Sequence, residues 1–293
     1  MRILPGVSVI ILGLSLPAAA ETVSADCTAL TAALRSIGGQ TLTAPPAGPE
    51  AGWCVLDGAI LKGSDPGFPE ISVERLRLRG TVADGVPVSV ELEAAGLRAR
   101  PRIGDRTMDD RIRAMLQLQS ADLRFVASVD ADTETLELRE VVLRLSGGTE
   151  VMLAADIRGA GLTFASFAGG SLTALDLDWR SDGRLLRLAL AMAGERLAEG
   201  GTEAEAIDAT RAALRAIVEA LPEAMVSPES RAALARMVAG LPQGRGRLRL
   251  SLTATEGIGA SRLLLAGLSD DPTGPDALKR LLADARLEAS WQP

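Results

Sequence analysis

The sequence predicts an α+β protein in which repeated antiparallel β-hairpins form a curved sheet, partly covered by four or five helices. Two observations lead to this prediction. Apolar residues recur at every second position in many segments, which is the period of a strand with one buried face. Between residues 202 and 241 the apolar period changes to that of a helix, so a helical hairpin is expected between two groups of strands. Hairpin-paired strands with helices on one face define the α+β class.

The clearest hairpin is predicted between Thr135 and Leu162. Apolar side chains alternate on both sides of a turn at residues 146–148, which a helix does not accommodate. The alternating positions are Val141, Leu143 and Leu145 before the turn, and Val151, Leu153, Ala155 and Ile157 after it. The alternation slips by one residue just before Val141, so a β-bulge is expected near Arg139 and Glu140.

The remaining elements follow from the same two periods. Strands are predicted at residues 53–61, 71–80, 86–97, 121–129 and 172–190 with a turn at 181–183. Further strands are predicted at residues 247–254 and 261–268, joined by a turn at 256–259, and at 287–291. Helices are predicted at residues 24–37, 107–119, 202–221 and 227–241, and a short one opens at Pro275. Both helices of the predicted hairpin have start signals, a capping box formed by Thr202 with Glu205 and an N-cap at Ser227 followed by proline. Residues 44–52 are rich in Pro and Gly and read as a connector.

The first residues predict export from the cytoplasm. Arg2 precedes an apolar run from Ile3 to Leu16, and small residues follow in an Ala-x-Ala pattern that ends at Ala20. This is the pattern of a secretory signal peptide, residues 1–20, cleaved after about Ala20. Residues 21–293 are then expected to form a single α+β domain in the periplasm with no membrane span. An uncleaved anchor is the alternative.

The chain has two cysteines, Cys27 and Cys54. In an oxidising compartment they are expected to form a disulfide that pins the first helix to the first strand. Two buried free thiols are the alternative.

Composition excludes several kinds of catalytic site, metal site and partner. The chain has no histidine and no tyrosine, and aromatic residues make up 2% of it. Without histidine there is no Ser-His-Asp or Cys-His arrangement and no imidazole metal site. The net charge of −7 argues against nucleic acid or an anionic membrane surface as a partner, because both attract basic faces.

Two acidic groups have the spacing of a cation site. Asp130, Asp132 and Glu134 could begin a calcium loop, but the turn glycine and the terminal glutamate of such a loop are missing. A polar hairpin turn is the favoured interpretation. The second group precedes the last predicted helix, where carboxylates favour a helix N-terminus. Its members are Asp270, Asp271 and Asp276.

Other candidate motifs are weaker. Neither Lys62 nor Lys279 lies in an S-x-x-K motif, and the G-x-G at residues 244–246 precedes a strand where a dinucleotide loop follows one. An arginine stripe on one predicted strand fits either an anionic-ligand site or, as favoured here, a solvated sheet face. It consists of Arg75, Arg77 and Arg79. No catalytic, cofactor-binding or metal-binding residue is therefore predicted.

Residues 175–221, which begin LDLDWRSDGRLLRLALAMAGE and continue into two alanine-rich helices, resemble exported bacterial proteins of unknown function. In those proteins a strand, a D-x-G turn and a helical hairpin recur. The hairpins separated by Gly-Leu steps are more loosely similar to the AsmA-like group of periplasmic proteins, which implies a link to the envelope and to lipid handling. The chain lacks the N-terminal anchor helix and the greater length usual in that group, and the resemblance assigns no residue a catalytic role.

The leading expectation is a non-catalytic periplasmic binding or envelope-associated protein without a cofactor, whose ligand is apolar, such as an acyl chain. It follows from the surplus of Leu, Val and Ala on strand faces and the lack of a reactive constellation. One alternative is a protein-interaction or structural module with a filled core, which holds an envelope protein at a sheet edge or at the helical hairpin. A second alternative is a hydrolase that uses carboxylates alone.

Overall fold

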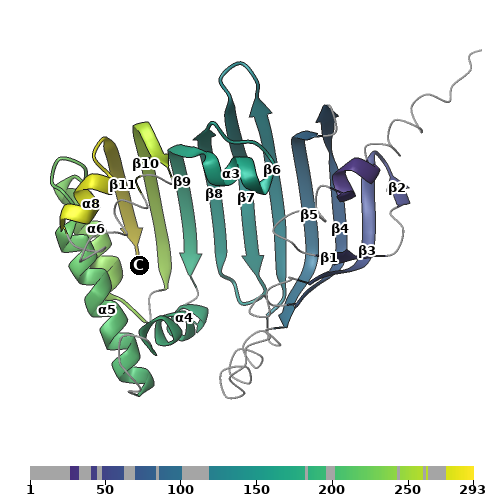
Figure 1. Cartoon of the computed structure of the whole chain (residues 1–293). Helices are drawn as coiled ribbons and strands as arrows, with labels where there is room; N and C mark the ends of the chain where they lie inside the picture. Colours follow the sequence, from purple (N-terminus) through teal and green to yellow (C-terminus); the bar gives the residue numbers. More distant parts are fainter. Residues whose placement is uncertain are drawn as a thin grey trace, which may run out of the picture.

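The computed structural model describes residues 27–32, 41–44, 48–62, 70–83, 86–100, 119–181, 184–195, 202–242, 245–259, 262 and 275–293. Its strands form one antiparallel sheet of eleven strands in the order β1-β3-β4-β5-β6-β7-β8-β9-β10-β11, and β2 also pairs with β3. Figure 1 shows the strands side by side in this order, with α5 and α6 at the C-terminal end of the sheet. The predicted α+β class and antiparallel sheet are confirmed.

The strands are β1 (Thr41–Thr43), β2 (Gly48–Glu50), β3 (Trp53–Lys62), β4 (Glu70–Ala83), β5 (Val86–Arg100), β6 (Ala121–Asp130), β7 (Thr135–Leu145), β8 (Glu150–Arg158), β9 (Ser171–Ser181), β10 (Gly246–Gly259) and β11 (Ala285–Gln292). The helices are α3 (Phe164–Gly169), α4 (Arg184–Glu195), α5 (Glu203–Ala220), α6 (Pro228–Ala239) and α8 (Pro275–Leu281), and residues 27–32 are also helical.

The pairing register aligns the alternating residues of neighbouring strands, so the sheet has two unlike faces. Leu153 lies opposite both Val141 and Leu177, and Leu177 lies opposite Leu250. Since successive side chains of a strand point to opposite sides, this row belongs to one face, here called the apolar face. The intervening residues, mostly charged, form the charged face.

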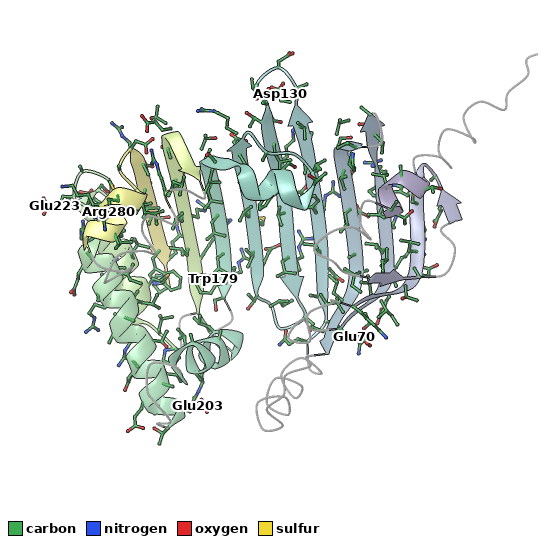
Figure 2. The ribbon with its side chains drawn as sticks, in the orientation of Figure 1. Glu70, Asp130, Trp179, Glu203, Glu223 and Arg280 are labelled. Carbon is green, nitrogen blue, oxygen red and sulfur yellow. A yellow bond between two sulfur atoms is a disulfide. The ribbon has the colours of Figure 1, made fainter. Side chains whose placement is uncertain are left out.

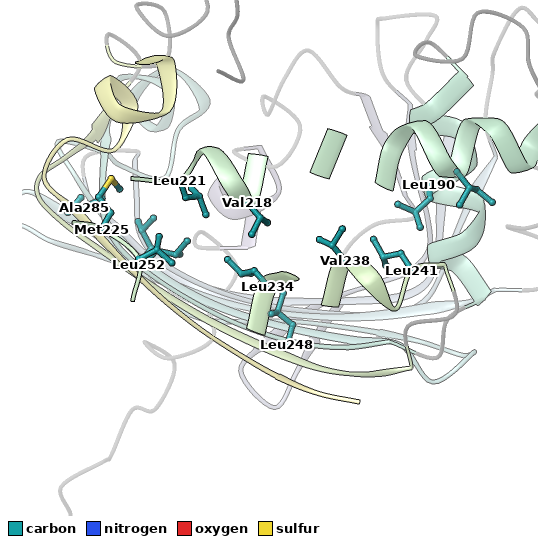
Figure 3. Close-up of a cluster of buried hydrophobic side chains, with 14 of the residues drawn as sticks. Leu190, Val218, Leu221, Met225, Leu234, Val238, Leu241, Leu248, Leu252 and Ala285 are labelled. Atoms are coloured by element: carbon teal, nitrogen blue, oxygen red, sulfur yellow. The ribbon is translucent and has the colours of Figure 1, made fainter. Parts of the chain in front are cut away.

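Three buried clusters lie on the apolar face. Figure 3 shows the first of them, in which Leu248 and Leu252 of β10 pack under Leu234 and Val238 of α6 on the inner side of the curved sheet. The second cluster covers β3, β4 and β5 at the N-terminal end of the sheet. The third contains Leu136 of β7, which is 1% exposed, together with residues near the start of α3. Helices therefore cover both ends of the apolar face.

Local sequence explains where the helices begin and how closely they pack. Thr202 and Glu205 form the predicted capping box at α5, and Ser227 accepts a hydrogen bond from the backbone N–H of Ser230 at the start of α6. The backbones of α4 and α5 meet at Gly194, where an added Cβ would lie 1.8 Å from a carbonyl oxygen of α5. Glycine is therefore required at this crossing.

Most predicted strands are confirmed. These include β3, the hairpin of β4 and β5, β6, the central hairpin of β7 and β8, and β11 at the C-terminal end. The bulge in the central hairpin is also confirmed, since the register of β7 against β8 shifts between Leu138 and Val141. The short helix opening at Pro275 is present as α8.

The second arm of the hairpin predicted at residues 172–190 is wrong, because residues 184–195 form helix α4. This segment has no β-branched residue and is rich in Leu, Arg, Ala and Met, which are strong helix formers. Leu186 and Leu190, two of its leucines at alternate positions, are four residues apart and therefore also lie on one face of a helix.

Two further expectations differ from the structure. The turn expected at residues 256–259 does not form, because β10 continues to Gly259 through a bulge after Thr253. The connector expected at residues 44–52 contributes β2, which pairs with β3. The predicted signal peptide and the helix at residues 107–118 lie outside the described residues, as does most of the strand at 261–268.

The predicted disulfide is confirmed. Cys27, in the helix at residues 27–32, is bonded to Cys54 of β3 with a Cα–Cα distance of 5.5 Å. Both half-cystines are buried in the second cluster. The bond therefore fastens the first described helix to the N-terminal end of the sheet.

Candidate functional site

Six apolar side chains at the centre of the apolar face belong to none of the three buried clusters of described residues. They are Val141, Leu143 and Leu145 of β7, Val151 and Leu153 of β8, and Leu177 of β9. Each is half-buried. We call this set the central strip.

The central strip forms because three neighbouring strands pair in register. Val141 lies opposite Leu153, Leu143 lies opposite Val151, and Leu177 continues the first row on β9. The strip extends about 13 Å along β7 and about 10 Å across the three strands, from the usual rise per residue and strand spacing. A partly covered apolar area between two fully covered regions of one face is the candidate surface for binding another molecule.

The opposite face carries a ladder of ion pairs between neighbouring strands. Arg77 of β4 pairs with Glu93 of β5 at 2.9 Å, and Arg79 donates to Glu91 at 2.6 Å. Arg75, the third member of the predicted arginine stripe, pairs with Glu50. All three guanidinium groups thus have carboxylate partners, which supports the solvated-face interpretation over an anionic-ligand site.

Arg124 of β6 connects several strands of this ladder. Its guanidinium nitrogens lie 3.0 Å from oxygens of Glu91, Glu93 and Glu140. The hydrogen bond to Glu140, and the charges of all three carboxylates, raise the pKa of Arg124 above its ordinary value. The residue therefore stays cationic and ties β5, β6 and β7 together.

A second group of ion pairs joins β9 to β10. Asp178 accepts a hydrogen bond from Arg247 Nε at 2.7 Å and one from Arg249 Nε at 3.3 Å. These hydrogen bonds, chiefly that from Arg247, lower the pKa of Asp178 below its ordinary value. Asp178 is thus held ionised near the C-terminal end of the charged face.

A groove of about 710 Å³ crosses β7 to β11, and members of both groups of ion pairs line it, among them Glu140, Asp178 and Arg249. Its lining includes the row Val141–Leu153–Leu177–Leu250 and the residues on both sides of that row, and these flanking residues belong to the charged face. We call it the transverse groove. Sequence reasoning missed it, because its walls assemble from single residues on five strands.

The predicted calcium group forms a hairpin turn. Asp130 Oδ1 accepts a hydrogen bond from the backbone N–H of Asp132 at 2.9 Å, and hydrogen bonds led by that from the Thr133 side chain lower the pKa of Asp130. Figure 2 shows Asp130 at the end of the hairpin, away from the body of the sheet. No cluster of three or more potential metal ligands occurs within the described ranges.

The structure does not bring the remaining candidate residues, the second acidic group and the two lysines, together in one site. Asp270 and Asp271 lie outside the described residues, and Asp276 is in the first turn of α8. Lys62 pairs with Glu70 at 3.3 Å, whereas Lys279 is exposed near the end of α8. A serine–lysine nucleophile therefore gains no support.

The sheet edges are largely occupied. At β11 the backbone N–H of Leu287 donates to the carbonyl of Met225 at 2.8 Å, and that of Ala289 donates to Ser230 Oγ at 3.0 Å. At the other end, β1 and β2 are each three residues long. Short or covered edges disfavour strand addition by a partner.

Comparison with known proteins gives no relative, since no family model, curated protein or solved structure matches the chain. In the described part of the chain, no helix has both the length and the apolar character needed to cross a bilayer.

Proposed function

We propose that the protein is an exported, non-catalytic binding protein of the periplasm or envelope that holds an apolar ligand, such as an acyl chain, against the central strip. The observation that supports this proposal is the strip itself, six half-buried Leu and Val side chains between covered parts of one sheet face. The Cys27–Cys54 disulfide supports export, because such bonds persist in oxidising compartments.

Burial energetics are sufficient for such a ligand. Covering the remaining exposed part of six mostly buried side chains gains about 0.5 kcal/mol each, a fraction of the value for full burial of Leu or Val. An acyl chain adds about 0.8 kcal/mol per buried methylene, so about ten methylenes bring the gross gain to about 11 kcal/mol. Association costs at least about 4 kcal/mol, which leaves about 7 kcal/mol at most and corresponds to a Kd of about 10 μM.

Titration with a dansyl-labelled medium-chain fatty acid tests the proposal. The double variant Leu153→Gln/Leu177→Gln changes two opposed residues of the strip. Each leucine contributes about 0.5 kcal/mol, so the variant is expected to bind the probe about fivefold more weakly than the wild type. Circular dichroism and urea unfolding establish that the variant remains folded.

The matched control is Val86→Gln. Val86 is an apolar residue at the start of β5 that is 47% exposed and lies outside the strip. It is expected to leave the affinity for the fatty acid unchanged. Absence of binding by the wild type, or an equal loss in the control, would instead favour a sheet face that is simply filled.

A further inference from the structure

The transverse groove lies on the face opposite the central strip, so an apolar ligand bound to the strip does not occupy it. We propose that the transverse groove is a docking site for an extended segment of a partner protein in which basic and apolar side chains alternate. This proposal does not rest on the apolar-ligand function.

One wall of the groove is acidic. Its residues lie in one row across the sheet, because Ala154 lies opposite Asp176, Asp176 opposite Ser251, and Ser251 opposite Glu288. Glu140 continues the row on β7. Carboxylates thus stand on every second strand, about 10 Å apart, with only small side chains between them.

Two of these carboxylates retain their full negative charge toward the groove. Glu140 is bonded to Arg124, but Asp176 and Glu288 form no ion pair with any residue in the described ranges. Both are exposed. Their charges are therefore available to a cation on an incoming chain, and they repel nucleic acid and anionic lipid.

The opposite wall is apolar where the ladder of ion pairs is interrupted. Val142 of β7 is 3% exposed, and it lies opposite Met152 of β8, which is half-buried. From β9 onward this wall is polar, with Asp178, which pairs with Arg247, and then Arg249 and Ser290. A methionine side chain adapts to different apolar partners, so the part of the wall on β7 and β8 suits an aliphatic side chain of a polypeptide.

The dimensions of the groove fit an extended peptide. From β7 to β11 it crosses four strand spacings, about 19 Å, and an extended chain covers about 3.3 Å per residue. About six residues therefore fill it. Ser227 and Ser230 line the end beside β11. In an extended segment, alternate side chains can meet the acidic wall and the apolar wall in turn.

The test uses fluorescence anisotropy with a labelled heptapeptide of alternating lysine and leucine, blocked at both ends. The wild type is expected to bind it, and to bind the glutamate–leucine peptide of equal length at least tenfold more weakly. The variant Asp176→Asn/Glu288→Gln is expected to weaken lysine–leucine binding about tenfold, by loss of two exposed ion pairs. Added salt is expected to weaken wild-type binding.

Asp132→Asn/Glu134→Gln is the matched control, since it makes the same change of charge in an exposed turn outside the groove. It is expected to leave the affinity within twofold of the wild type. Equal weakening by this control would show general charge attraction and overturn the proposal. So would absence of binding by the wild type.

Substitutions at two consecutive residues of β8 test the two faces of the sheet separately. Met152→Gln alters the groove and Val151→Gln alters the central strip, because their side chains point to opposite sides of the sheet and Val151 does not line the groove. Met152→Gln is expected to weaken peptide binding about fivefold, whereas Val151→Gln weakens only fatty-acid binding. If the groove variant left peptide binding unchanged and the strip variant weakened it, the peptide would lie on the apolar face, and the proposal would be overturned.

Sedimentation tests a second copy of the chain as the occupant of the groove. If the wild type self-associates and Asp176→Asn/Glu288→Gln abolishes this self-association, the groove is an interface between copies of the chain, and the proposal is also overturned.

Discussion

Removing the disulfide with the double substitution Cys27→Ala/Cys54→Ala is expected to lower the free energy of unfolding by about 3.5 kcal/mol at 25 °C. The two cysteines are 27 residues apart, and the chain-entropy relation for a closed loop of this length gives about 3.5 kcal/mol. The bond also holds the helix at residues 27–32 against the second cluster, where Cys27 and Cys54 are 7% and 3% exposed. The loss is therefore a large fraction of the stability of a typical domain.

Urea unfolding followed by circular dichroism measures this loss, and the m-value shows whether the unfolded state has expanded. The wild type reduced with a phosphine is the control, because it breaks the cross-link without removing the two sulfur atoms from the core. It is expected to lose nearly as much stability as the double variant. A loss below about 1 kcal/mol in both would contradict the argument, since the loop-closure term alone exceeds that value.

Three further predictions concern the sheet and the helices. Arg124→Gln is expected to lower the free energy of unfolding by about 1 kcal/mol more than Arg139→Gln, because Arg124 pairs with three carboxylates and Arg139 with one. Urea unfolding at low and high salt measures the loss in both variants. Equal losses would contradict the role of the ladder. Because Arg247 lowers the pKa of Asp178, this carboxylate stabilises the fold above its unfolded-state pKa of about 4 and loses that contribution as pH falls through its lower folded-state pKa. Asp178→Asn is expected to flatten the decrease in urea midpoint as the pH falls below about 4, and an unchanged slope would contradict this. Gly194→Ala is expected to lower the thermal midpoint by several degrees, since a Cβ would lie 1.8 Å from the α5 backbone, and an unchanged midpoint would show that the two helices separate at no cost.

The sheet was predictable because alternation is a local property. Val141, Leu143 and Leu145 show the period of two within five residues, and pairing preserves it on the neighbouring strands. Capping signals at Thr202 and Ser227 are equally local, and both helices begin where these residues predict. Helix α4 was missed because leucines at alternate positions also occur in an amphipathic helix of strong helix formers, and α4 buries Leu190 and Ala191 in the first cluster.

The candidate binding surfaces required information that the sequence does not contain. The central strip is defined by which parts of the apolar face the helices leave outside the buried clusters, and this depends on tertiary packing. The transverse groove depends on a register that aligns Asp176 with Ser251, 75 residues later in the chain, and Ser251 with Glu288, a further 37 residues along. A one-residue slip in either pairing would move these side chains to the other face.

Native mass spectrometry of the protein, purified without detergent from the cells that produce it, tests the central claim most directly. The wild type is predicted to carry an additional mass that organic solvent removes and that is identified as a molecule with an acyl chain. The Leu153→Gln/Leu177→Gln variant, prepared in the same way, is predicted to have lost most of it. A wild-type spectrum that shows only the mass of the polypeptide, at every stage of purification, would contradict the proposal that the central strip binds an apolar ligand.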